Sequence, residues 1–90
     1  MIVLQSGSFK RRVKKLHKNE KQALDQALMK IIEDPSIGDL KIGDLAGIQV
    51  FKYKHKSQLN LIGYQYIEEK LVLTFIEHGS HENFYRDLKT

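Results

Sequence analysis

A histidine and a tyrosine lie four residues apart near the end of this 90-residue chain, at His81 and Tyr85. They follow the apolar run 71–76, which is typical of a β-strand, and a short helix over 81–88 would place both side chains on one helix face. Histidine can donate or accept a proton near neutral pH, and an aromatic ring can stack on an unpaired RNA base. The pair could therefore act on phosphodiesters, although a surface His81 and a core Tyr85 would fit the same pattern.

Lysines alternate along a second segment, at Lys52, Lys54 and Lys56. A strand over 48–56 would place their ammonium groups in one row with neighbours about 6.6 Å apart, because every second side chain of a strand shares a face. This spacing is close to that of successive phosphates along a nucleic-acid strand. The row could bind a phosphate backbone, or it could be the solvated face of an edge strand, where lysines discourage aggregation.

The charge of the chain favours an anionic partner. Lysine and arginine number 15 against 11 acidic residues, which gives a net charge of +4. Much of the positive charge is concentrated in 10–18, a segment that includes Arg12 and Lys15. Basic clusters of this kind are typical of proteins that bind nucleic acid, an anionic membrane surface or an acidic protein.

Several classes of site and location are disfavoured. The chain has no cysteine, which excludes disulfides, thiolate metal sites and a cysteine nucleophile. His78 and His81 have a spacing that metal ligands sometimes show, but no third ligand lies near them, so we expect no metal and no cofactor. No apolar run approaches the roughly 20 residues of a membrane span, and the first residues do not resemble a signal peptide. We therefore expect a cytoplasmic protein without a membrane partner.

The elements that position these residues begin with a strand and two helices. A short strand at 2–5 precedes a turn and a basic helix that starts near Phe9. The second helix has apolar residues at i, i+1, i+4, i+5, i+8 and i+9, which predicts a wide buried face. We expect it to begin at an Asn19 cap paired with Gln22, and to end before Pro35.

Three β-rich runs, at 48–56, 59–66 and 71–76, follow a turn-rich connection over 35–47. Their short connections predict hairpins, and hence an α+β fold with an antiparallel sheet of about four strands. The helix hairpin should cover one face of this sheet. The other face would be available to bind a ligand or substrate, and the short C-terminal helix would cover part of it. We expect residues 1–90 to form one domain.

Three segments resemble the RelE/ParE superfamily of bacterial type II toxins, and its RelE-like branch in particular. They are Gly-Asp-Leu-Ala-Gly at 43–47, Val-Phe-Lys-Tyr-Lys at 50–54, and the tail from Gly79 to Lys89. The resemblance covers nearly the whole chain and implies a microbial-ribonuclease-like fold and a cognate antitoxin. It also implies a metal-independent endoribonuclease that cleaves messenger RNA on the ribosome. In such enzymes the 2′-hydroxyl attacks the adjacent phosphate, and translation is inhibited.

The resemblance also implies roles for individual residues. Lys52 and Lys54 match lysines that hold the scissile phosphate or help to deprotonate the 2′-hydroxyl. His81 matches a histidine or arginine that assists the leaving 5′-oxygen or stabilises charge, and Tyr85 matches an aromatic residue that stacks on the substrate base. From their charge, we expect further RNA contacts from Lys56, Arg86, Arg12 and Lys15.

The chain departs from the family pattern on the strand at 59–66. RelE-type toxins often carry an arginine there, whereas Asn60 occupies the nearest position in this chain, so a phosphate-binding arginine would be Arg86, Arg12 or absent. Two other functions stay open. The ParE branch inhibits DNA gyrase without catalysis, and the same fold could be a non-catalytic RNA-binding module. The presence of lysines, histidine and tyrosine together favours RNA cleavage.

Overall fold

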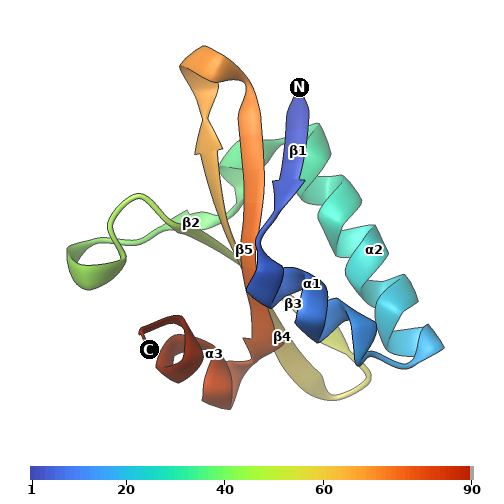
Figure 1. The fold of residues 1–90 in the computed structure, drawn as a ribbon. Coiled ribbons are helices and arrows are strands. Elements are labelled where there is room, and N and C mark those ends of the chain that lie inside the picture. Colours follow the sequence, from blue (N-terminus) through green and yellow to red (C-terminus); the bar gives the residue numbers. More distant parts are fainter. Residues whose placement is uncertain (90) are drawn as a thin grey trace.

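The computed structural model describes residues 1–89, and the side chains of Glu82 and of residues 87–89 are outside that description. Helices lie on both faces of a five-stranded sheet, whose strand order is β1-β5-β4-β3-β2 (Figure 1). The elements are β1 (Ile2–Gln5), α1 (Gly7–Lys14), α2 (Lys18–Glu33), β2 (Asp39–Leu40), β3 (Gln49–His55), β4 (Gln58–Ile67), β5 (Val72–Ser80) and α3 (His81–Lys89). Short 3₁₀ turns lie at Pro35–Ile37, Gly43–Leu45 and Glu68–Lys70.

The sheet is antiparallel except at one edge. β3 pairs with β2 and with β4, and β4 pairs with β5, all antiparallel, whereas β1 runs parallel to β5. The predicted α+β fold is confirmed, with its N-terminal strand, helix pair, largely antiparallel sheet and short C-terminal helix. A fifth strand is present because Asp39 and Leu40, in the predicted turn region, pair with the start of β3. No helix in the described part of the chain is long and apolar enough to cross a membrane.

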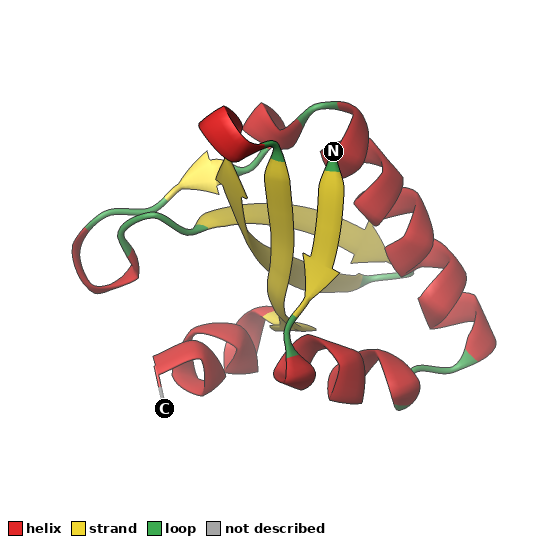
Figure 2. Cartoon of the chain, turned by 45° about the horizontal axis from the view of Figure 1, so that its top comes forward, coloured by secondary structure: helices red, strands yellow, loops and turns green. Residues whose placement is uncertain are grey.

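Local capping sets where α1 and α2 begin. The hydroxyl oxygen of Ser6 accepts a hydrogen bond from the backbone N–H of Phe9 at 3.0 Å, which caps α1. The prediction of an Asn19 cap for α2 was wrong, because the helix begins earlier, at Lys18. There the carboxylate of Glu20 accepts a hydrogen bond from the backbone N–H of His17 at 3.0 Å. Figures 1 and 2 show both helices on the same side of the sheet.

Each face of the sheet carries its own apolar core. The larger core packs under α1 and α2 and consists of Phe9, Leu24, Ala27, Ile31, Ile62, Tyr64, Leu73 and Phe75. On the other face, Val50 and Leu61 pack against Phe84 of α3. Gly63 allows this contact, since a Cβ at that position would lie 2.8 Å from Cζ of Phe84. Among the described side chains of α3, Phe84 is the one that is buried, so this ring fixes α3 on the sheet.

The connection between α2 and β2 is held by the buried hydroxyl of Tyr64. This group donates a hydrogen bond to the carbonyl of Pro35 at 2.7 Å and accepts one from the N–H of Gly38 at 2.9 Å. A Cβ at Gly38 would lie 2.5 Å from the same hydroxyl oxygen, so only glycine fits there without a shift. The anchored connection sets the start of β2, and with it the position of the residues that follow.

Candidate functional site

The face of the sheet that α3 partly covers carries the lysines of β3. Along this strand Val50 is buried, and Lys52 and Lys54 are exposed on the same face. The register places Lys52 opposite Leu61 and Lys54 opposite Leu59 of β4. Because Leu61 and Val50 form the core under Phe84, both lysines lie on the α3 side of the sheet.

α3 brings the predicted histidine and tyrosine to this same side. It starts at His81, directly after the last residue of β5. His81 is exposed and lines a pocket together with Leu59, the cross-strand partner of Lys54. One turn later Tyr85 is half-buried and packs edge-on against Phe84, with ring centroids 5.2 Å apart. We call the surface formed by Lys52, Lys54, His81 and Tyr85 the lysine face.

Lys41 also belongs beside the lysine face, although the sequence pattern did not single it out. Its backbone N–H donates a hydrogen bond to the carbonyl of Ile48 at 2.9 Å, which extends the β2–β3 pairing by one position. Cross-strand partners share a face, so the side chain of Lys41 lies on the α3 side. Its Nζ is 5.7 Å from the ring centroid of Tyr85, within the range of a cation–π interaction.

Lys56 does not continue the row of lysines. β3 ends at His55, and Lys56 adopts the left-handed conformation, with φ of 56°, in the turn that leads to β4. It lines a separate pocket with His17 and Glu20 at the start of α2. The predicted row of three lysines was therefore wrong, and the row contains two. Arg86 is exposed on α3, next in sequence to Tyr85.

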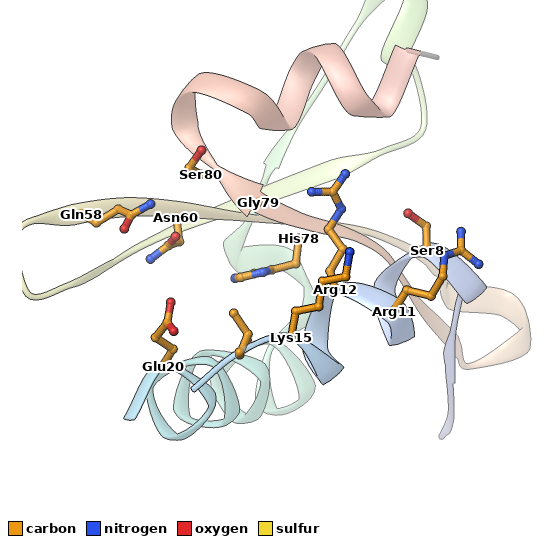
Figure 3. Close-up of a pocket in the computed structure, with 11 residues that line it drawn as sticks. Ser8, Arg11, Arg12, Lys15, Glu20, Gln58, Asn60, His78, Gly79 and Ser80 are labelled. Atoms are coloured by element: carbon orange, nitrogen blue, oxygen red, sulfur yellow. The ribbon is translucent and has the colours of Figure 1, made fainter. Parts of the chain in front are cut away.

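The two remaining predicted RNA contacts, Arg12 and Lys15, line a cavity of about 400 Å³ between α1 and the strands β4 and β5. We call this cavity the α1 pocket (Figure 3). Asn60 lines it too, because its side chain alternates with those of Leu59 and Leu61 and so points away from the lysine face. The β4 residues opposite the two lysines are thus leucines, and β4 supplies no arginine to that face.

A polar network adjoins the α1 pocket, which three of its members, Ser8, Arg12 and His78, also line. Glu77 and His78 are each 5% exposed. A carboxylate oxygen of Glu77 is 3.0 Å from Nε of Arg12, and the other accepts a hydrogen bond from the hydroxyl of Ser8 at 2.8 Å. Nε2 of His78 is hydrogen-bonded to the hydroxyl of Tyr53 at 2.7 Å. Nothing in the sequence pattern indicated this network, because its members come from α1, β3 and β5.

Burial sets the charge states of the Tyr53–His78 pair. Removal from water disfavours the charged form of each ring, so burial lowers the pKa of His78 and raises the pKa of Tyr53. The nearby guanidinium of Arg12 lowers the pKa of His78 further, while the carboxylate of Glu77 opposes that effect. Both members of the pair are therefore neutral at pH 7.

The lowered pKa of His78 predicts a loss of stability on acidification. As the pH falls through about 6.5, the ordinary value for histidine, the unfolded chain takes up a proton that the folded protein does not. The contribution of neutral His78 is thus complete above that pH and is lost as the pH falls toward the lowered pKa. Urea unfolding of the wild type and of His78→Gln from pH 8 to pH 5 should show a larger fall in the wild type. Equal falls would contradict this assignment.

No group of three histidine, aspartate or glutamate side chains that could hold a metal ion occurs among the described residues. The lysine face instead combines positive charge, an imidazole and an aromatic ring on two adjoining elements. Such groups can neutralise a phosphate, transfer a proton and stack on a base. The α1 pocket is a separate polar site, and it opens beside the start of α3.

Comparison with known proteins identifies a matching family and solved structures that share the fold. A family model described as a ParE-like toxin of type II bacterial toxin–antitoxin systems matches residues 3–89. No curated protein sequence matches the chain significantly. A chain of the intact E. coli RelBE toxin–antitoxin complex has a TM-score of 0.71 at 22% identity, over 87% of this chain and 93% of that one.

Two further solved structures share the fold. The isolated E. coli RelE toxin has a TM-score of 0.69 at 24% identity, over 88% of this chain and 82% of that one. A chain of the RelBE2 complex from Mycobacterium tuberculosis has a TM-score of 0.72 at 16% identity, over 89% of this chain and 96% of that one. At these identities the likeness concerns the fold.

Proposed function

The chain belongs to the ParE-like toxins of type II bacterial toxin–antitoxin systems, and from this premise we propose that it is a metal-independent, ribosome-dependent endoribonuclease that cleaves messenger RNA and thereby inhibits translation. The observation that carries the proposal is the lysine face, where exposed Lys52 and Lys54 share one side of the sheet with His81 and Tyr85. The fold shared with the E. coli RelE toxin supports it.

In the proposed reaction the nucleophile comes from the substrate itself. The 2′-oxygen of one nucleotide attacks the adjacent phosphorus, and its proton passes to solvent water. The bond between phosphorus and the 5′-oxygen breaks, and the leaving 5′-oxygen takes up a proton. The products are a 2′,3′-cyclic phosphate and a 5′-hydroxyl end. The protein must therefore stabilise an extra negative charge on the phosphate and supply a proton to the leaving group.

The lysine face provides groups for both tasks. Lys52 and Lys54 bind the non-bridging oxygens and stabilise the pentavalent phosphorane. His81, at the end of the face next to Leu59, donates the proton to the 5′-oxygen. Tyr85 stacks on the base beside the cleaved bond. Since β4 carries leucines where an arginine could reach the phosphate, we assign further positive charge at this site to Arg86, next in sequence to Tyr85, and to Lys41, beside the Tyr85 ring.

The proposed partners are the ribosome, messenger RNA and a cognate antitoxin, all met in the cytoplasm. The E. coli RelE fold occurs in a complex with an antitoxin. In this chain Leu40 and Ile42, which flank Lys41, are 67% and 88% exposed. Both residues alternate with Lys41 and so lie on the opposite face of β2 from the lysines. An acidic amphipathic antitoxin segment that wraps this edge could place its apolar side chains on Leu40 and Ile42 and its carboxylates near Lys41.

Lys41 should act by holding the ring of Tyr85 and by adding charge to the site. Replacing it with alanine removes a cation–π contact worth roughly 0.5–1 kcal/mol at an exposed position, so we expect cleavage to slow about 2- to 5-fold. Lys41→Arg should keep most of the activity, because arginine retains the charge and can stack on the ring. Single-turnover cleavage of a ribosome-bound message measures both. Lys30→Ala, exposed on α2 at the far side of the sheet, is the matched control and should leave the rate unchanged.

Parallel assays of the two candidate targets test the proposed function. Purified protein is added to ribosomes translating a defined message, and primer extension locates any cuts. The same preparation is added to DNA gyrase in a supercoiling assay. Discrete cuts in the message with unimpaired supercoiling are the expected result. An intact message with inhibited gyrase would instead assign the chain to non-catalytic gyrase poisons, and no effect in either assay would leave an RNA-binding module.

A further inference from the structure

The α1 pocket has no part in the reaction proposed above, yet its lining is that of a binding site. One wall carries cations of the first helix segment, and the other carries amide and hydroxyl side chains of the strands (Figure 3). The cations are Arg11, Arg12 and Lys15, and the neutral polar groups are Gln58, Asn60 and Ser80. Its volume of about 400 Å³ falls within the range of small-molecule sites, roughly 300–1,000 Å³.

The α1 pocket adjoins the end of the lysine face at His81. Gln58 and Ser80 line the α1 pocket and also line the pocket that contains His81 and Leu59. Ser80 is the last residue of β5, and His81 is the first residue of α3. A chain-like ligand that reacts at His81 can therefore pass Ser80 and enter the α1 pocket without leaving the protein surface.

The lining groups match the parts of a nucleotide. Guanidinium and ammonium groups are the usual ligands of phosphate oxygens. The carboxamides of Asn60 and Gln58 each offer donors and an acceptor, which is what the edge of an RNA base requires. α1 contains no acidic residue. The carboxylate of Glu77 is occupied by Arg12 and Ser8, so it does not repel a phosphate as an unpaired charge would.

The two kinds of group are separated within the pocket. In Figure 3, Arg11 lies on the side of Ser8, whereas Asn60 lies on the side of Gln58 and Glu20. Glu20, the acidic side chain of the lining, is thus beside the amides and away from Arg11. This arrangement favours phosphate toward the α1 wall and a base toward the β4 wall.

We propose that the α1 pocket binds the nucleotide of the RNA chain next to the one cleaved at the lysine face, with its phosphate on Arg11 and Lys15 and its base on Asn60 and Gln58. The inference rests on the proposed function, which places RNA on the lysine face. An RNA chain and a free nucleotide present the same phosphate ester, and the position of the pocket beside His81 favours the chain. Arg12 holds α1 to β5 through Glu77 and forms part of the wall.

Binding of non-cleavable 2′-O-methyl RNA to the purified protein tests the inference. Fluorescence anisotropy gives the affinity for labelled oligonucleotides of increasing length, at several salt concentrations. The pocket variant carries Arg11→Gln and Lys15→Gln. The matched control carries Lys10→Gln and Lys14→Gln, which remove the same charge from exposed positions of the same helix that do not line the pocket. Thermal unfolding by circular dichroism verifies that every variant is folded.

In the wild type, one added nucleotide should raise the affinity in a distinct step as it enters the α1 pocket. The pocket variant should lose this step, by about 5- to 20-fold, and its salt slope should fall by about 0.7 for each phosphate that the protein no longer neutralises. Asn60→Ala should lower the affinity without changing the salt slope, because it removes a base contact only. The control should retain the step. Equal losses in the pocket variant and the control, or a step that survives in the pocket variant, would overturn the inference.

Two competition experiments distinguish other ligands. A mononucleotide that binds through Arg11 and Lys15 while no length step exists would assign the pocket to free nucleotides and overturn the RNA-chain assignment. An acidic peptide that displaces the oligonucleotide from the pocket more effectively than unlabelled RNA would assign it to a protein partner, with the same consequence. The oligonucleotides cannot be cut, so binding and cleavage are tested separately. If the affinity shows the length step but the message is not cleaved, the proposed function alone is overturned. If the message is cleaved but the affinity shows no length step, the assignment of the α1 pocket alone is overturned.

Discussion

Lys54→Ala is expected to slow cleavage of a ribosome-bound message by at least about 100-fold, the effect of removing one charge-stabilising group from a transition state. Lys54 is exposed, and its partner across the strands is Leu59, which lines the same pocket as His81. Of the two lysines it is therefore the one beside His81, the group to which we assign the proton transfer. The expected effect is on the cleavage step, with little change in folding stability, because the side chain is not part of either core.

Single-turnover rates at saturating protein measure this effect directly. Lys52→Ala should also lower the cleavage rate. His81→Ala should lower the cleavage rate by about 100- to 10,000-fold, as expected for the loss of general acid catalysis. Lys30→Ala provides the control for loss of one positive charge on the opposite side of the molecule. If Lys54→Ala and Lys30→Ala cleave at the same rate, the lysine face is not the site of cleavage.

The second large effect is expected from Phe84→Ala. The ring of Phe84 packs against Val50 and Leu61, and Gly63 leaves no alternative side chain to fill the space. Removing it should cost about 3–5 kcal/mol of unfolding free energy. It should also release α3 from the sheet, and with it the positions of His81 and Tyr85. Cleavage should then fall far below the level explained by the unfolded fraction.

Ile31→Ala is the matched variant for this prediction. Ile31 is fully buried in the other core, under α2, and its truncation costs about 2–5 kcal/mol. Urea unfolding gives the folded fraction of each variant, and the cleavage rate is then expressed per folded molecule. That rate should be near the wild-type value for Ile31→Ala and strongly reduced for Phe84→Ala. Similar rates per folded molecule would show that α3 does not position the site. The milder substitutions Phe84→Leu and Ile31→Val allow the same comparison of rates per folded molecule, with a smaller loss of unfolding free energy.

Local patterns in the sequence predicted much of the fold, because the periodic elements bury one face. The apolar repeat of α2 and the break at Pro35 indicated that helix and its end, and the alternation along β3 indicated the face of Lys52 and Lys54. The types and the spacing of His81 and Tyr85 indicated a candidate pair, and the resemblance to RelE-like toxins implied a role for each. The structure brings these four residues to one side of the sheet.

The rest depended on contacts between distant segments or on backbone detail. Alternation by two predicted Lys56 in the lysine row, but a tight turn with positive φ intervenes. Lys41 reaches Tyr85 only through its pairing with Ile48, and β2 is too short for its composition to indicate a strand. The pair of Tyr53 and His78 joins two strands that are not neighbours in the sheet, so no periodicity could predict it.

Basic residues lie at two sites with different surroundings. Lys52 and Lys54 carry exposed charge on the side of the sheet that α3 partly covers, whereas Arg12 is paired with the buried carboxylate of Glu77. Charge alone predicted Arg12, Lys15, Lys56 and Arg86 as one set of RNA contacts. The structure places Arg12 and Lys15 on the opposite face of β4 from the two lysines, and Asn60 belongs with them.

The chemistry of the fragment ends tests the central claim most directly. A message stalled on purified ribosomes is incubated with the protein, and the ends of the released fragments are identified by mass spectrometry. Attack by the 2′-hydroxyl predicts a 2′,3′-cyclic phosphate on one fragment and a 5′-hydroxyl on the other, with both strongly reduced at the same incubation time when Lys54→Ala is used. Fragments with a 3′-hydroxyl and a 5′-phosphate, or a message that stays intact, would contradict the proposed mechanism.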